Sequence, residues 1–251
     1  MTRALGLATI GTLFTFAMTT LGAASVFLLD KRKKSRSRAV LLGFAAGVMT
    51  AASVWSLLLP AIEQARELAL PAYLPAAAGV ASGAVFLAAL DALALRLRGG
   101  ETDARRRSNA LLFTAITLHN LPEGMAVGLA FALAAEGEGL SAAAARAFGI
   151  GVQNFPEGAA ISLPMREMGC SRARSFIGGT LSGAVEPLFG VLAALGAVFV
   201  RRGMPWLLSF AAGAMLYVVV VELVPQSNTR GGVCGYMTGF LVMMTLDVAL
   251  S

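Results

Sequence analysis

The chain has 251 residues, of which 57% are hydrophobic and only 14% are charged, and its mean hydropathy is +0.75. A water-soluble domain carries about 25% charged residues, so this composition excludes an ordinary soluble protein and favours an integral membrane protein. The net charge of +6 does not indicate a nucleic-acid partner, because the basic residues stand in short clusters between apolar runs. The length suits a single transmembrane transport domain covering residues 1–251.

Apolar runs of about 20 residues, the length of a helix that crosses a bilayer, follow one another along the chain. Eight such runs lie near residues 5–29, 39–60, 73–97, 110–135, 142–167, 172–200, 204–225 and 232–250. The first is too long for the apolar part of a signal peptide, and the basic cluster KRKKSRSR at 31–38 follows it rather than precedes it. The sequence therefore predicts an all-α membrane protein with eight transmembrane helices.

The basic residues also predict an orientation. If both termini lie outside the cell, all but five of the 20 Lys and Arg residues fall in cytoplasmic segments, as the positive-inside rule requires. The adjacent Arg201 and Arg202 run against the rule, whereas the segment before the fifth span is acidic, with Glu136 and Glu138. We therefore expect both termini on the outer side of the membrane.

Two pairs of repeated motifs indicate internal symmetry. HNLPEG at 119–124 in the fourth span resembles QNFPEG at 153–158 in the fifth, and FAAGVM at 44–49 in the second resembles FAAGAM at 210–215 in the seventh. The members of each pair lie in spans of opposite direction, which is the pattern of an inverted repeat. In such folds the substrate site lies near the middle of the membrane.

The hexapeptides place polar side chains in the centre of two spans. His119 and Glu123 are four residues apart, as are Gln153 and Glu157, so each pair projects from one helix face. Ionisable groups in the middle of a span cost ~2.5–3.5 kcal/mol on the insertion scale and persist mainly for function. Imidazole, carboxylate and amide ligands suit zinc, iron(II) or manganese better than copper(I).

The neighbouring residues extend this candidate site. Asn120 and Asn154 stand one residue along each motif and open toward an adjacent position. Pro122 and Pro156 cannot donate to the carbonyl groups four residues earlier, which predicts a kink in each helix and free carbonyl groups at membrane depth. Such groups are tolerated where they line a wet cavity or meet an ion.

The paired hexapeptides, the eight spans and the basic segment between the third and fourth spans resemble the ZIP (ZRT/IRT-like protein) family of metal transporters, in its bacterial GufA-type branch. The resemblance implies an eight-helix bundle with inverted repeats that carries Zn²⁺ and related divalent metals toward the cytoplasm, with a two-metal site between spans 4, 5 and 6. Carried over to this sequence, the ligands of the first metal would be His119, Glu123, Gln153 and Glu157. Those of the second would be Asn120, Asn154 and Glu186, with Glu123 and Glu157 bridging the two metals.

The sequence departs from the family pattern near the predicted exit. Val221 precedes Glu222 where members of the family often have a histidine, and residues 96–109 contain no histidine at all. These differences argue against a high-affinity exit site and against metal sensing by that segment. Glu222 and Asp91 lie toward the cytoplasmic ends of their spans, where they either line an exit path or extend to the interface.

Several alternatives remain open at this point. An intramembrane metalloprotease needs a motif such as HExxH, which one histidine cannot supply, so we expect no enzyme and no cofactor, only the metal as substrate. Broader transport of Fe²⁺, Mn²⁺ or Cd²⁺ stays open, as does a proton-coupled carrier that uses the same carboxylates. The expected partners are the metal ion, membrane lipid and a second copy in a homodimer, and the expected location is the bacterial inner membrane.

Overall fold

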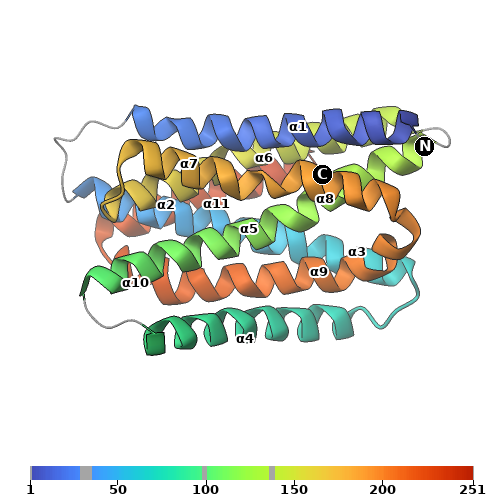
Figure 1. Ribbon diagram of the computed structural model, residues 1–251. Coiled ribbons are helices and arrows are strands. Elements are labelled where there is room, and N and C mark those ends of the chain that lie inside the picture. Colours follow the sequence, from blue (N-terminus) through green and yellow to red (C-terminus); the bar gives the residue numbers. More distant parts are fainter. Residues whose placement is uncertain (1, 29–35, 98–100, 136–138, 251) are drawn as a thin grey trace.

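The computed structural model describes residues 2–28, 36–97, 101–135 and 139–250, which form a bundle of long helices (Figure 1). No strand occurs among these residues. Most of the basic cluster at 31–38 lies outside the described residues, as do Glu136 and Glu138, so their predicted roles stay predictions.

Within the described residues, eight rods cross the bundle, each a single helix or a few helices stacked end to end. In chain order they are α1 (Thr2–Ala24) with the 3₁₀ turn η1 (Ser25–Phe27); α2 (Arg36–Ala52), η2 (Ser53–Leu58) and α3 (Leu59–Glu67); α4 (Tyr73–Leu97); α5 (Glu101–Ala134); α6 (Leu140–Glu167); α7 (Arg172–Gly183) and α8 (Val185–Leu195); α9 (Ala197–Val218), η3 (Val219–Leu223) and α10 (Val224–Gln226); and α11 (Arg230–Leu250). The all-α prediction is confirmed. The edges differ by several residues, and α5 begins well before the predicted residue 110.

Six of the rods in the described part of the chain are long and apolar enough to cross a membrane by composition alone. The two that do not meet this criterion are α5 and α6, which carry the polar hexapeptides. Both pack against other helices of the bundle, α5 mainly against α8 and α6 mainly against α1. The two rods that miss this criterion are therefore those that hold the candidate site.

The helix contacts follow the two-fold pattern that the repeated motifs predict. α1 packs along α6 and α5 along α8, while α2 packs along α11 and α4 along α9. The repeat relates the first three spans to the last three, in order, and the fourth span to the fifth. Under this relation the α1–α6 contact corresponds to the α5–α8 contact, and the α2–α11 contact corresponds to the α4–α9 contact. The same exchange relates two further contacts, that of α5 with α9 and that of α6 with α2.

Small residues bring these helices together. A Cβ atom on Gly47 of α2 would overlap the backbone of Tyr236 in α11, and one on Gly83 of α4 would overlap the backbone of Phe210 in α9. Close approach through glycine is typical of membrane helices, which associate by packing rather than by a hydrophobic driving force. These two contacts make α2–α11 and α4–α9 closely packed pairs.

Two short π-helical segments interrupt the second and seventh spans at equivalent places. η2 and η3 each begin four residues after the methionine of the repeated FAAGxM motif, at Met49 and Met215. A proline follows each segment, Pro60 in α3 and Pro225 in α10. Because proline has no N–H to donate, the turn before it loses a regular i to i−4 bond and widens. By contrast, α5 and α6 continue as helices through Pro122 and Pro156.

The sixth span is divided at Ala184, between α7 and α8. The break places Glu186 in the first turn of α8, where a carboxylate is favoured by the free backbone N–H groups of the helix start. Figure 1 shows α1 beginning at the right end of the bundle and α11 ending to the right of its middle, so both termini lie in the same half.

Candidate metal centre

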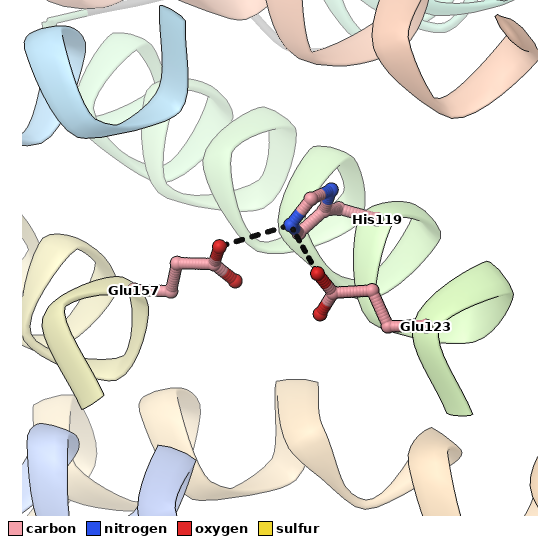
Figure 2. A group of neighbouring side chains, drawn as sticks. All are labelled: His119, Glu123 and Glu157. Atoms are coloured by element: carbon pink, nitrogen blue, oxygen red, sulfur yellow. Dashed lines mark hydrogen bonds and ion pairs between the residues drawn. The ribbon is translucent and has the colours of Figure 1, made fainter. Parts of the chain in front are cut away.

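The centre of the bundle contains three side chains that face one another. Figure 2 shows His119 between the two carboxylates, with Glu123 on the same helix, α5, and Glu157 on α6. The Nε2 atom of His119 lies 3.1 Å from Oε1 of Glu157 and 3.3 Å from Oε1 of Glu123. One potential ligand atom from each residue lies within 4.8 Å of the other two. These residues come from both copies of the hexapeptide, as the repeat predicts.

Several polar atoms of this trio have no hydrogen-bond partner although they are buried. They are both carboxylate oxygens of Glu123, Oε2 of Glu157 and Nδ1 of His119. Leaving buried polar atoms unpaired costs about 1–3 kcal/mol each, and more for charged groups, so their gathering at one point favours the binding of a cation there. Two carboxylates and a neutral imidazole balance the charge of a dication and offer the ligand types of zinc.

The residues predicted for a second metal lie nearby but are arranged differently. Glu186 accepts hydrogen bonds from Oγ1 of Thr19 at 2.9 Å and from Nδ2 of Asn154 at 2.8 Å. Oδ1 of Asn154 and both polar side-chain atoms of Asn120 are buried without a partner. Glu186 is therefore held by protein donors, while the two amides keep free oxygen atoms that could meet an ion.

The final glycine of each hexapeptide has a packing role that the motif alone did not reveal. A Cβ atom on Gly124 would lie 2.5 Å from the Cα and backbone oxygen of Glu186, and one on Gly158 would overlap the backbone of Thr19 in α1. Glycine thus lets α5 approach α8, and α6 approach α1, directly beside Glu123 and Glu157. This close approach brings Glu186 to the centre.

Gln153 lies at the edge of the centre and is linked to a residue that the sequence analysis missed. Its Nε2 atom donates to Oδ1 of Asp247 in α11 at 2.6 Å, and the Ser56 hydroxyl of η2 donates to the same oxygen at 2.6 Å. Asp247 is 4% exposed, and its other oxygen has no partner.

A further repeat in the sequence could have identified Asp247. GVASGAVFLAALD at 79–91 and GYMTGFLVMMTLD at 235–247 share two glycines and the final aspartate at equal spacing. Asp91 and Asp247 therefore occupy equivalent positions in α4 and α11. The repeat is hard to recognise from the sequence because glycine is common in membrane helices, where it serves packing.

A cavity of about 690 Å³ leads to this centre from one end of the bundle. Glu123, Gln153 and Asp247, all nearly buried, line its inner part. Its mouth contains the exposed side chains of Glu63, Glu67, Arg146 and Arg201. Glu63 and Glu67 thus form an acidic part of the rim, with two arginines beside it. Ser56 lines the cavity, whereas Met49 and Ser53 are buried.

The opposite end of the bundle is crossed by ion pairs. Arg107 of α5 contacts Asp91 of α4 at 3.3 Å and Glu222 of η3 at 3.7 Å. The Tyr217 hydroxyl donates to the second oxygen of Asp91 at 3.2 Å. Asp91 and Glu222, predicted to lie near an exit, are therefore joined by a guanidinium group.

Comparison with known proteins finds relatives over nearly the whole chain. The family model of the ZIP zinc transporter matches residues 99–247, more than half of the chain. The chain is 36% identical to the zinc transporter GufA of Myxococcus xanthus, covering 98% of this chain and 100% of that protein. It is 37% identical to the zinc transporter ZIPB of Bordetella bronchiseptica over 98% of this chain and 82% of that protein, and 36% identical to the zinc transporter ZIP11 of Bos taurus over 97% of each. The chain therefore belongs to the ZIP zinc transporter family of membrane proteins.

Proposed function

We propose that this protein transports Zn²⁺ across a membrane through the centre formed by His119, Glu123 and Glu157. The observation that carries the proposal is the group of buried, unpaired carboxylate oxygens beside His119 at the inner end of a cavity. A cation that reaches this point gains ligands whose burial is otherwise uncompensated. The relatives named as zinc transporters support zinc as the cargo.

The number of ligands suits a metal that must leave again. Structural zinc sites are closed by four protein ligands, whereas sites with three keep a position for water or another ligand. Within the described residues, the His and acidic side chains of the cluster number three, one histidine and two glutamates, and the neutral amide of Gln153 is the proposed fourth, weaker ligand. Asn120 and Asn154 offer further oxygen atoms nearby for a second ion, held together with Glu186. We take this second ion as part of the proposal.

The charge distribution supports an orientation of the protein in the membrane, and the proposed direction of transport rests on that orientation. The basic cluster at 31–38 lies between the first two spans, and the mouth of the cavity lies at the far end of the second, where Glu63 and Glu67 stand. Under the positive-inside rule the cavity faces the outside and the basic segments face the cytoplasm. The proposed movement is therefore inward across the inner membrane, with both termini outside and no catalytic reaction.

Radioactive zinc uptake by proteoliposomes tests the proposal. Wild-type protein should accumulate Zn²⁺, and Glu157→Gln should abolish most of the uptake because it removes one of two charges that balance the ion. Glu67→Gln, the same chemical change at the exposed mouth of the cavity, is the matched control and should retain uptake. Equal uptake by wild-type protein and Glu157→Gln would contradict the assignment.

Competition measurements address selectivity and coupling in the same vesicles. Excess Cd²⁺, Mn²⁺ or Fe²⁺ is added, and both the inhibition of zinc uptake and the uptake of the added metal are measured. A metal that inhibits zinc uptake and is itself transported would extend the cargo to a broader set of divalent metals. A pH-sensitive dye inside the vesicles reports proton movement. Proton flux without metal would favour the carrier that uses the carboxylates as a proton relay, and would contradict a role centred on the metal.

A further inference from the structure

The ion pairs at the end opposite the cavity involve groups that the metal centre does not use. The side chains of Asp91 and Glu222 are 11% and 8% exposed, and that of Arg107 is 26% exposed. The Nε atom of Arg107 is itself buried and has the Asp91 carboxylate 3.3 Å away. Since these groups are only partly hydrated, their attraction exceeds that of a fully exposed pair.

The inverted repeat shows what the same positions do at the other end. Asp91 is the counterpart of Asp247, and Glu222 is the counterpart of Ser56, since each follows the FAAGxM methionine by seven residues. Asp247 and Ser56 line the open cavity. Their counterparts are bound to the guanidinium group of Arg107. One set of positions is thus open to a cavity while the equivalent set is occupied by a cationic side chain.

Arg107 adds a charged contact between α5 and the neighbouring pair of α4 and the seventh span. Asp91 and Glu222 belong to the closely packed pair of α4 and the seventh span, since a Cβ on Gly83 or on Gly213 would overlap backbone atoms of the partner helix. Arg107 belongs to α5, the helix that carries His119 about three turns further along. The contact therefore fastens the metal-binding helix to a neighbouring helix pair.

We propose that Arg107 is a tethered cation that closes the inner half of the pathway by occupying Asp91 and Glu222. We call these three residues the inner latch. The guanidinium group pairs with both carboxylates and offsets one of their two negative charges while the cavity is open at the other end. Passage of the metal requires Arg107 to leave them, so that the arriving dication and water take its place. This inference rests on the proposed transport function and adds a residue that controls access.

Cysteine accessibility tests the latch without measuring transport. The native cysteines Cys170 and Cys234 are replaced by serine, and Leu111→Cys introduces a reporter one turn beyond Arg107 toward the metal centre, where Leu111 is 4% exposed. The protein is placed in lipid nanodiscs and treated with a membrane-impermeant thiol reagent. Arg107→Gln should raise the labelling rate about tenfold, the effect of losing one partly buried charge contact, and Arg107→Lys should raise it less.

Two controls separate local opening from general loosening. Arg230→Gln removes an exposed arginine at the start of α11 and should leave the labelling of Leu111→Cys unchanged. A second reporter, Leu208→Cys, lines the cavity at the other end and should not react faster in Arg107→Gln. If both reporters speed up equally, or neither does, the latch is refuted.

The reciprocal variant tests the contact from the other side. Asp91→Asn combined with Glu222→Gln keeps Arg107 but removes its charged partners, so it should also raise the labelling rate of Leu111→Cys. An unchanged labelling rate would overturn the proposal, even if the Arg107→Gln protein failed to fold. Zinc binding to the purified Arg107→Gln protein should stay within about twofold of wild type, because Arg107 lies about three turns from His119. A wild-type protein that moved no zinc would refute the transport proposal, whereas the labelling result would still decide the latch.

Discussion

Replacing Glu123 by Gln gives the sharpest test of the metal centre. Glu123 is 3% exposed, neither of its carboxylate oxygens has a hydrogen-bond partner, and Oε1 lies 3.3 Å from Nε2 of His119. The substitution preserves the shape of the side chain and one oxygen ligand while it removes one negative charge. Any change in zinc affinity therefore reports mainly the electrostatic contribution of that charge.

The magnitude follows from Coulomb's law. At a separation of ~4 Å and an effective dielectric constant of ~20, two unit charges interact by ~4 kcal/mol, so a dication and a carboxylate interact by ~8 kcal/mol. The remaining amide oxygen and entering water recover part of this free energy. We expect the binding free energy to fall by ~2.7–4 kcal/mol, which raises the zinc dissociation constant about 100- to 1,000-fold.

Titration calorimetry on the purified protein measures this loss. Glu63→Gln makes the same chemical change at the exposed mouth of the same cavity and should alter the affinity only a few-fold. The thermal stability of Glu123→Gln without metal should not fall, because the change relieves repulsion between Glu123 and Glu157. A variant that binds zinc as tightly as wild type would refute the reasoning, and so would one that loses affinity only because it unfolds.

Three further predictions concern packing, the cavity and protons. Gly124→Ala should cost about 1–3 kcal/mol of stability and reduce zinc uptake, since its Cβ would lie 2.5 Å from the backbone of Glu186. The control is Gly203→Ala, whose Cβ would meet nothing within 4 Å. It should leave the melting temperature unchanged or higher. Asp247→Asn keeps an oxygen for the hydrogen bonds from Ser56 and Gln153 but removes a charge from the cavity, so uptake at low zinc concentration should fall while uptake at saturation persists; equal curves would exclude a role in attracting the ion. Zinc affinity should decrease as pH falls, because the ligands bind only as neutral imidazole and ionised carboxylates; calorimetry in buffers of different ionisation enthalpy should detect released protons, and a pH-independent affinity would contradict the ligand set.

Much of the site could be predicted because helical spacing is a local property. His119 and Glu123 lie on one face of any helix that contains them, and the hexapeptide repeat places Glu157 on the matching face of an antiparallel neighbour. The structure brings all three within 4.8 Å. Gln153 stays a predicted ligand through its amide oxygen, since only its Nε2 atom is hydrogen-bonded to Asp247.

The sequence by itself determined the class of the protein and its helical segments, and it singled out the residues proposed to hold a metal, because hydropathy and helical periodicity depend on neighbours in the chain. Only the tertiary structure decided that Asp247 joins the centre, that Gly124 admits the backbone of Glu186, and that Arg107 bridges Asp91 and Glu222. These contacts join residues of different spans, and their existence depends on the depth and rotation of each helix in the bundle. Packing sets that depth and rotation, since helices approach closely only where small residues meet, and no single segment of sequence carries that information.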